Sequence, residues 1–315
     1  MLEPSWIGRR VTVRRVVGHT VGGRAQFGDV IGDLVGLDAR TAVLDSRSGL
    51  VEVALESVTI AKPAPPSTAD ELALQAIAAA GWRAGETAQL GGWLLRATGG
   101  FTARANSVLP LRTPGMDLDE ALRRAGEWYA ERGLPLRLLV PMQARRLLDA
   151  ELGERGWRTE GIVHTMAGRL DMLHAGPGDE HGVEIADVPD DRWLGRYRDG
   201  AGTTPIARRL LTRHDRAGFA SIRDGEHVLA IGRGTVDDTW LGVTAVEVEP
   251  GHRRRGLARA VMAALWGWGS DRGATRSYLQ VSVDNLPGVA LDESLGYWVH
   301  HDYRYRLAPE SGPLR

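Results

Sequence analysis

Three consecutive arginines precede a glycine in the stretch VEVEPGHRRRGLARAV, residues 246–261. Apolar residues alternate up to Pro250 and recur at helical spacing after Gly256, which predicts a strand, a basic turn and the beginning of a helix. The first backbone N–H groups of a helix have no partner within it and carry the positive end of the helix dipole. Glycine lets an anion approach the backbone, and arginines add charge-assisted hydrogen bonds. The turn is therefore a candidate phosphate site.

Two familiar phosphate loops do not fit these residues. Gly251 and Gly256 have the spacing of a P-loop, but Leu257 and Ala258 stand where that loop requires lysine and serine or threonine. The glycine pattern of a dinucleotide-binding fold is also missing. Taken alone, the three arginines fit an ordinary helix start with solvated side chains equally well, so the surrounding elements must decide between the two interpretations.

Two segments of the chain share one order of elements. Residues 118–140 and residues 257–283 each predict an amphipathic helix, a glycine stop and an apolar strand. A shorter helix that ends in glycine and an aromatic residue follows each strand. Equivalent glycines such as Gly133 and Gly273 lie 140 positions apart. This offset predicts a duplicated α+β unit.

The domain organisation follows from these elements. Short alternating strands predict a small β-barrel, similar to SH3-like modules, over residues 1–62. The proline-rich segment AKPAPPS, residues 61–67, predicts an extended linker. The two α+β copies then occupy residues 68–173 and 183–315, with the glycine-rich segment 174–182 between them.

The composition limits what these domains can do. The 315 residues carry a formal charge of -1 and an isoelectric point near 6.8, which excludes a surface built throughout for nucleic acid or an acidic membrane. No cysteine occurs, so disulfides, thiolate metal sites and a cysteine nucleophile are excluded, and no spaced ligand set predicts a metal. No apolar run reaches the length of a membrane span, and we expect a cytoplasmic protein.

The basic turn resembles a known family when its context is included. RRRGLA, residues 253–258, is similar to the Q/R-x-x-G-x-G/A signature of the GCN5-related N-acetyltransferases, and it follows a strand ending V-x-V-x-P, as in that family. Downstream, QVSVDNLPGVALDESLGYWVHHDYRYR resembles the family's fifth strand, asparagine, short helix and last strand. The resemblance covers residues 183–315 and implies a mixed, splayed central sheet flanked by helices. Residues 68–173 resemble the same fold without the phosphate turn, which implies a degenerate, non-catalytic copy.

The resemblance implies acetyl-CoA as co-substrate and an acetyl transfer by direct attack of a primary amine in a ternary complex. A bulge in the fourth strand would open a gap for the pantetheine, whose main-chain partners would include Val246 and Val248. A strand amide near Val246 would also stabilise the oxyanion. The positions that the resemblance assigns to acetyl-CoA are Val246, Val248, Arg253, Arg254, Arg255, Gly256, Leu257, Ala258 and Asn285.

The acid and the base are less well matched. Asp292 occupies the position where the family often has a tyrosine that protonates the departing thiolate. An ordinary aspartate is ionised at neutral pH, so either burial raises its pKa, another group serves, or the thiolate leaves unassisted. Glu247 is the nearest carboxylate on the fourth strand and is a candidate general base, although a solvated strand residue is the alternative.

The acceptor amine is suggested only by further resemblance. Arg208 and Arg209 precede the second strand and could clamp a carboxylate, or they could form a solvated helix face. The segment WLLRATGGFTARANSVLPL, residues 93–111, together with the barrel and one intact copy, resembles actinobacterial proteins assigned as N-acetylglutamate synthases. That resemblance implies glutamate as acceptor and a place in amino-acid biosynthesis.

Several other functions remain open from the sequence. One intact copy of two also resembles mycothiol synthase, or an N-acetyltransferase acting on a small amine, an aminoglycoside or a protein lysine. A different class is a non-catalytic protein that senses acyl-CoA or binds peptide or nucleic acid through an SH3-like or Tudor-like barrel. The near-neutral charge argues against nucleic acid as a partner. We expect a small-molecule amine as the partner and no membrane.

Overall fold

The computed structural model describes residues 1–176 and 182–309. The chain divides into two compact units, Met1–Ser67 and Thr68–Arg315, and the boundary falls at the end of the predicted proline linker. Part of the predicted linker 174–182, residues 177–181, lies outside the described residues. Within the described ranges, no helix has the length and apolar character needed to cross a membrane.

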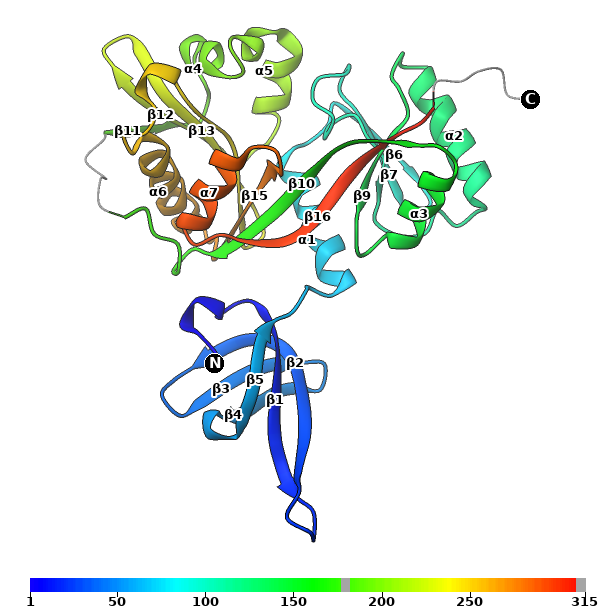
Figure 1. The fold of residues 1–315 in the computed structure, drawn as a ribbon. Coiled ribbons are helices and arrows are strands. Elements are labelled where there is room, and N and C mark those ends of the chain that lie inside the picture. Colours follow the sequence, from blue (N-terminus) through cyan, green and yellow to red (C-terminus); the bar gives the residue numbers. More distant parts are fainter. Residues whose placement is uncertain (177–181, 310–315) are drawn as a thin grey trace. The chain divides into compact units, whose positions relative to one another are not determined.

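The first unit is an antiparallel sheet. Its strands are β1 (Arg10–His19), β2 (Ala25–Leu37), β3 (Thr41–Ser46), β4 (Gly49–Ala54) and β5 (Val58–Pro63), in the spatial order β4-β3-β2-β1-β5 (Figure 1). Alternation along β1 buries Val11 and Val13 against Leu34 and Leu44, as a half-buried strand requires. The edge strands β4 and β5 do not pair with each other among the residues described, so the predicted closed barrel is not confirmed.

The second unit contains the remaining helices and strands. Its helices are α1 (Thr68–Gly81), α2 (Leu118–Ala130), α3 (Arg146–Glu154), α4 (Asp191–Arg196), α5 (Pro205–Thr212), α6 (Leu257–Ser270) and α7 (Leu286–Ser294). Its strands are β6 (Glu86–Leu90), β7 (Trp93–Ala97), β8 (Leu109–Pro110), β9 (Arg137–Pro141), β10 (Arg158–Arg169), β11 (Val183–Ala186), β12 (Ala217–Asp224), β13 (His227–Asp237), β14 (Trp240–Val248), β15 (Arg276–Ser282) and β16 (Trp298–Leu307).

One eight-stranded sheet runs through both halves of this unit, in the order β11-β12-β13-β14-β15-β10-β16-β9. The two long strands β10 and β16 pair antiparallel towards one end of the sheet, between β15 and the edge strand β9. β10, which follows α3, lies beside β15, whereas β16, which follows α7, lies beside β9. The last strand of each half has therefore crossed to the other half (Figure 1).

Because of this exchange, the predicted boundary between residues 68–173 and 183–315 does not divide the unit into two independent sheets. The order helix, strand, helix, strand does recur as α2-β9-α3-β10 and α6-β15-α7-β16, in line with the predicted duplication. However, the segments 68–173 and 183–315 do not form separate sheets, because each supplies a strand to the other. Each half therefore also contributes side chains to the other half's interior.

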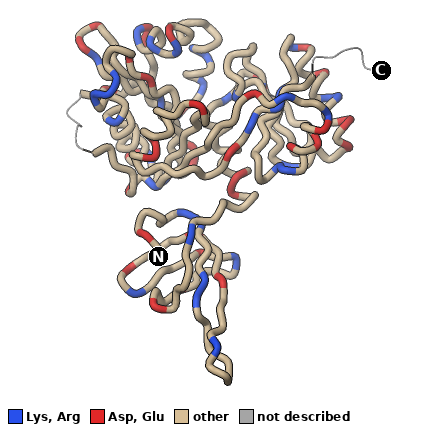
Figure 2. The backbone as a smooth tube through the Cα atoms, viewed as in Figure 1, with Lys and Arg blue, Asp and Glu red and all other residues tan. Residues whose placement is uncertain are grey.

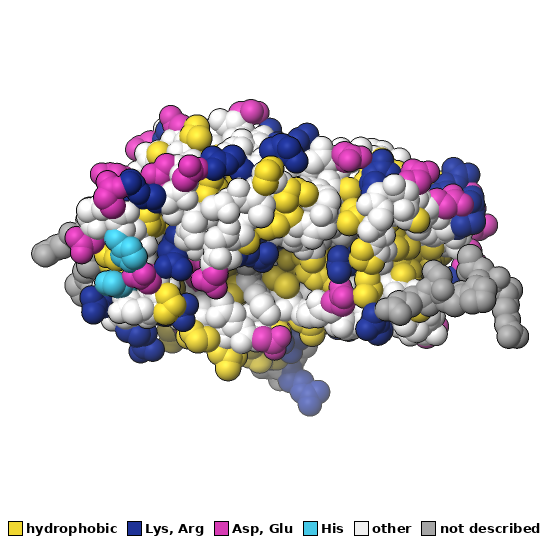
Figure 3. Space-filling view, turned by 90° about the horizontal axis from the view of Figure 1, so that it is seen from above, with side chains coloured by type: hydrophobic (Ala, Val, Ile, Leu, Met, Phe, Trp, Pro, Cys, Tyr) yellow, Lys and Arg dark blue, Asp and Glu magenta, His cyan; other side chains and the backbone are white. Residues whose placement is uncertain are grey.

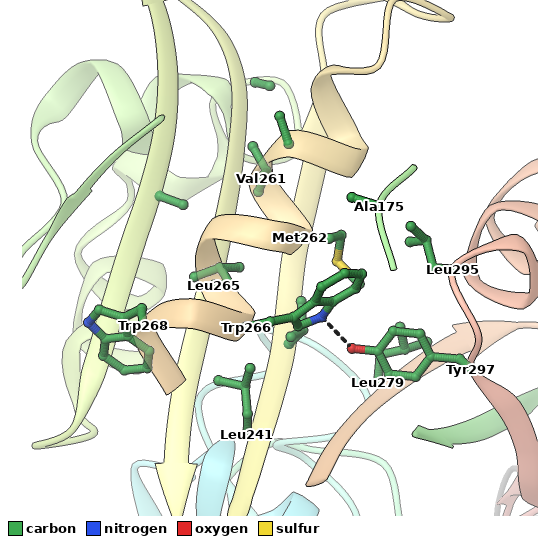
Figure 4. Packing of buried hydrophobic residues seen from close by; sticks show 14 of the residues in the cluster. Ala175, Leu241, Val261, Met262, Leu265, Trp266, Trp268, Leu279, Leu295 and Tyr297 are labelled. Atoms are coloured by element: carbon green, nitrogen blue, oxygen red, sulfur yellow. Dashed lines mark hydrogen bonds between the residues drawn. The ribbon is translucent and has the colours of Figure 1, made fainter. Parts of the chain in front are cut away.

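Helices cover both faces of the C-terminal half of the sheet. α6 packs on β13 and β14 through Val261 and Leu265, and Nε1 of Trp266 donates a hydrogen bond of 2.9 Å to the hydroxyl of Tyr297 (Figure 4). Gly232 permits this close approach, since a methyl group there would overlap Cγ1 of Val261. α4 and α5 cover the opposite face, where they form a second core with β12 and β13. The sheet is thus held from both sides, as in other α+β domains.

Charges of both signs alternate along the chain in both units (Figure 2). Most charged surface side chains sit near a partner, such as Arg123 between Glu120 and Glu127 on α2. Exposed pairs of this kind contribute little to stability.

Candidate active site

A gap between β14 and β15 provides the site. The two strands pair in parallel only from Trp240 with Arg276 to Val243 with Leu279, and no pairing follows. On its other side, β14 carries one extra residue opposite β13, and Ala245 in this bulge has a φ of 55°. A bulge bends its strand. The fourth strand is therefore splayed from the fifth, as the resemblance implied, and its main-chain groups beyond Val243 face the gap.

A cavity of about 460 Å³ occupies this gap. Its lining combines three sets of side chains. The strands β14 and β15 supply Val243, Thr244, Ala245, Val246, Glu247, Leu279, Gln280, Val281 and Ser282; helices α6 and α7 and the residue before α7 supply Met262, Asn285, Gly288, Leu291 and Asp292; and the rest comes from Trp82, Thr102, Ala103, Arg104, Val163, Tyr197, Arg198, Tyr303 and Tyr305. In Figure 3 the face of this unit is hollowed near its middle, with hydrophobic side chains at the bottom of the hollow and basic side chains beside them.

The exchanged strands bring both halves of the unit to this cavity. Val163 comes from β10, and Tyr303 and Tyr305 come from β16. Trp82 follows α1, and Arg104 lies in the loop after β7. The N-terminal half, which the sequence predicted to be a degenerate copy, therefore supplies part of the cavity wall.

Glu247 lies in this wall and is partly buried. Its two carboxylate oxygens accept hydrogen bonds from the backbone N–H of Arg198, at 3.2 and 3.0 Å. Burial raises the pKa of Glu247 above its usual value, although the backbone N–H and the charge of Arg198 oppose the shift. A carboxylate with a raised pKa is a better proton acceptor near neutral pH.

Asp292 lies on α7 at the same cavity, with only 8% of its surface exposed. Burial raises its pKa from 3.8 to about 7. Burial thus shifts this pKa in the direction that the first of the three alternatives requires. The cavity thus contains two carboxyl groups in different surroundings, one on a strand and one on a helix.

The basic turn forms an anion-binding geometry next to the cavity. Gly256 is the N-cap residue of α6 with a φ of 84°, and Arg254 also has a positive φ, of 65°. Gly256 has no side-chain cap, so the first amides of α6 remain available to a ligand. Met262, further along the same helix, lines the cavity. A ligand with an anionic end and an extended chain could therefore reach from the turn into the gap.

The other predicted cofactor residues differ in their placement. Asn285 lines the cavity and caps α7, since its Oδ1 accepts a hydrogen bond of 3.2 Å from the backbone N–H of Gly288. Val246 lines the cavity, whereas Val248 does not, and Nε of Arg253 donates to the Val248 carbonyl at 3.3 Å. Leu257 is buried in the core beneath the turn. Of the predicted cofactor residues, Val246 and Asn285 therefore line the cavity, whereas Val248 and residues 253–258 of the basic turn do not.

The arginines predicted to clamp the acceptor lie elsewhere. Arg208 on α5 forms an ion pair with Asp191. Arg209 lines a separate hollow of about 310 Å³ with Gly85, Glu86 and Ile206. Neither residue contributes to the cavity at the splayed strands. Their helix packs its apolar face inward, so these two side chains point away from the site.

Sequence reasoning missed the cavity residues of the N-terminal half. Trp82 and Arg104 lie more than 140 positions before Glu247, and no spacing rule links them. The segment around Arg104 did draw attention through resemblance, and its paired glycines and Asn106 are typical of a structured turn. Nothing local shows that this turn reaches the cavity of the other half.

Comparisons with known proteins agree with this geometry. A family model described as "Probable histone acetyltransferase Rv0428c C-terminal" matches residues 68–306. The chain is 32% identical over 319 residues to "Probable histone acetyltransferase Rv0428c" of Mycobacterium tuberculosis, an alignment that covers 98% of both. It is 27% identical over 241 residues to "Uncharacterized N-acetyltransferase YobR" of Bacillus subtilis, covering 74% of this chain and 97% of the relative. A GCN5-related N-acetyltransferase structure from Kribbella flavida superposes with a TM-score of 0.59 at 17% identity, covering 76% of this chain and 96% of that one, and shares the fold.

Proposed function

Because this chain belongs to the GCN5-related N-acetyltransferases, in the family described by the Rv0428c C-terminal model, we propose that it transfers the acetyl group of acetyl-CoA to a primary amine. The chain is an acyltransferase. In this proposal the transfer takes place in the cavity at the splayed strands. The observation that carries this proposal is the cavity of about 460 Å³ between β14 and β15, with two carboxyl groups in its wall and an anion-binding turn beside it.

The co-substrate fits the residues present. The amides at the start of α6, from Arg254 to Ala258, would hold the pyrophosphate, with Arg253, Arg254 and Arg255 adding charge. The main-chain groups of β14 that β15 leaves unpaired beyond Val243 would bind the pantetheine amides. Asn285 would contact the chain between them. Bound in this way, acetyl-CoA supplies an electrophilic thioester carbon inside the cavity.

The reaction forms one bond and breaks one. The neutral amine nitrogen bonds to the acetyl carbon, the carbon–sulfur bond breaks, and the electron pair leaves with the sulfur. In our proposal Glu247 takes the proton that the nitrogen must lose, because its carboxyl group lies in the cavity wall and burial raises its pKa. A backbone N–H near Val246 stabilises the negative charge that develops on the acetyl oxygen.

Asp292 would supply the proton for the departing thiolate. It lies across the cavity wall on α7, at the position where the family often has tyrosine, and its pKa of about 7 leaves part of the population protonated at neutral pH. A cavity with one acid and one base is suited to moving two protons in opposite directions.

Two classes of acceptor enter the test. The printed name of the Mycobacterium relative points to a protein lysine. The resemblance of residues 93–111 to N-acetylglutamate synthase-like proteins points to a free amino acid such as glutamate, and therefore to amino-acid biosynthesis. Both are primary amines, so both use the same two carboxyl groups.

The test combines binding with turnover. Isothermal titration calorimetry measures the Kd for acetyl-CoA, and thiol release measures transfer to a panel of amino acids, polyamines, aminoglycosides and lysine peptides. Gly256→Asp places a side chain at a φ of 84° and a negative charge at the proposed phosphate site, so we expect acetyl-CoA to bind at least about tenfold more weakly. The matched control is Gly267→Asp, at an exposed position near the other end of α6 with open space around it.

Unchanged affinity in the Gly256→Asp variant would show that the phosphates bind elsewhere. Acetyl-CoA binding without turnover on any amine would favour the non-catalytic, acyl-CoA-sensing alternative.

A further inference from the structure

A buried guanidinium in the cavity wall has not been used so far. Arg104 lines the cavity, and its Nε has no contact with solvent and no hydrogen-bond partner among the described residues. No carboxylate pairs with Arg104 in the part of the chain that the structure covers. The rest of the side chain has neighbours, since it bonds to the phenol of Tyr303 and lies against the ring of Trp82. A buried donor that is left unpaired is costly, so the free Nε is a position that an acceptor group of a ligand would satisfy.

Other buried arginines show how this chain satisfies such groups. Arg96 donates from Nε to the carbonyl of Ser107 at 3.1 Å and from a terminal nitrogen to the Ser107 hydroxyl at 2.9 Å. Arg233 donates to the carbonyls of Leu211 and Gly81, at 2.8 and 3.1 Å, and so ties α5 to the end of α1. Arg104 bonds to the phenol of Tyr303 on β16, and its Nε, like Nη2 of Arg233, has no partner among the described residues. Of these two buried nitrogens, only the one of Arg104 belongs to a residue that lines the cavity.

The loop that carries Arg104 is held in a fixed shape. Oδ1 of Asn106 accepts hydrogen bonds from the backbone N–H groups of Thr98 and Gly100, at 2.7 and 3.0 Å. Nδ2 of Asn106 donates to the carbonyls of Phe101 and Thr102, both at 2.8 Å. Thr102 has a φ of 62°, which is a strained conformation for a β-branched residue. Strained backbone that is held so firmly is common at ligand sites.

The surroundings of Arg104 keep it charged and in position. The guanidinium lies 5.6 Å from the ring of Trp82, whose Nε1 donates to Thr102 at 3.2 Å. Burial alone would lower the pKa of Arg104, but the phenol groups of Tyr303, Tyr305 and Tyr278 outweigh this and raise it. The guanidinium of Arg233 lies 5.2 Å from the same Trp82 ring. This side of the cavity therefore has an excess of positive charge.

We infer that Arg104 binds a carboxylate of the acceptor, so that the acceptor is a free amino acid or another small amine bearing a carboxylate. This inference rests on the acetyl transfer proposed above, and it assigns the acceptor-binding residue to the N-terminal half of the unit. A guanidinium can hold a carboxylate through two parallel hydrogen bonds, which fixes the orientation of the amine as well. Glu247, which accepts the proton of the amine, and Arg104, which binds the carboxylate, then line the same cavity.

A protein lysine fits this wall poorly. The lysine side chain carries no negative group, so a bound lysine would leave the buried Nε of Arg104 without an acceptor. A carboxylate would supply that acceptor. The relative's name concerns that protein, whereas the charges in this cavity favour an acceptor with its own negative group.

The experiment compares acceptors that differ only in the carboxylate. We would measure kcat/KM by thiol release for L-alanine against L-alaninamide, L-glutamate against L-glutamine, and a terminally blocked lysine peptide, each corrected for the fraction of neutral amine. A further arm uses 2-aminoethylphosphonate to separate a carboxylate from another anion. The acids are expected to exceed their amides roughly 10- to 100-fold for at least one pair.

Arg104→Met keeps the length of the side chain and removes its charge. It should abolish that preference by lowering kcat/KM for the acids much more than for their amides, mainly through a higher KM. Arg104→Lys should restore part of the preference, and it also serves if the methionine variant does not fold. The control is Arg112→Met, at an exposed position a few residues later.

Equal use of acids, amides and the lysine peptide would overturn the inference, as would an equal loss on every acceptor in Arg104→Met. A preference for the phosphonate over all carboxylates would overturn it too. No turnover on any carboxylate acceptor, with acetyl-CoA still bound, would overturn the acceptor assignment and leave the co-substrate site standing. Loss of acetyl-CoA binding in the wild type would instead remove the proposed function itself.

Discussion

Replacing Asp292 by asparagine is expected to stabilise the fold at alkaline pH and to change nothing in acid. Asp292 is 8% exposed, and burial raises its pKa from 3.8 to about 7. Between these two values the folded protein holds a proton that the unfolded chain has already released. The associated stability is fully present below pH 3.8 and is lost as the pH rises through 7. Asparagine carries no charge at any of these pH values, so the variant should not lose this stability as the pH rises.

The size of the effect follows from the two pKa values. The difference between 3.8 and about 7, at about 1.4 kcal/mol for each pH unit, corresponds to roughly 4 kcal/mol at full ionisation. Relaxation of the cavity and entry of water reduce this, so we expect Asp292→Asn to exceed the wild type by roughly 2–4 kcal/mol at pH 8.5. The difference should close steadily towards pH 4.

Urea denaturation of the full chain at a series of pH values from 4 to 9 measures this difference directly. Glu293→Gln is the matched control, because Glu293 is the exposed neighbour on the same helix. Equal stability of the wild type and Asp292→Asn at every pH would refute the reasoning. Lower stability of the variant at pH 8.5 would show that the folded protein holds an ionised, partnered Asp292, and it would remove Asp292 as the proposed acid.

Two further predictions concern other titrating groups. Glu247→Gln should lower kcat roughly 100-fold and remove the fall in activity at acid pH, since a base works only above its pKa. The control is Glu249→Gln, because the Glu249 carboxylate pairs with histidines outside the cavity. This variant should leave kcat unchanged across the same pH profile. Burial, followed by the charge of His300, lowers the pKa of His301 to about 3, so the fold keeps this ring neutral. The free energy of unfolding should therefore fall as the pH drops below about 6.5. Urea denaturation of His301→Gln should show a shallower fall of this free energy with pH than the wild type. An equally steep fall in the variant would show that other groups cause the pH dependence.

The sequence by itself determined the local features of this protein. A strand that ends at proline, a basic turn and a helix beginning after Gly256 can be read from short-range patterns, because backbone geometry and helix dipoles depend on neighbouring residues. The resemblance of the same stretch to a family signature added the splayed strand, and the structure has that splay after Val243. The repeated order of elements was also visible as a constant offset of 140 positions.

Only the tertiary structure decided how the two halves combine. The exchange of β10 and β16 depends on pairings between strands that are distant in the chain, and neither strand's own pattern selects its partner. That exchange is why the predicted boundary near residue 180 does not separate two sheets.

The surroundings of the candidate site residues were likewise decided by tertiary structure. Asp292 has the residue type of an ordinary ionised carboxylate, and its raised pKa arises only because α7 carries it into the cavity wall. Arg208 and Arg209 had the expected type and position for an acceptor clamp, yet helix α5 turns them away, while Arg104 reaches the cavity from the other half. Solvation and long-range contact decide whether a charged side chain is surface or site, and a single sequence contains neither.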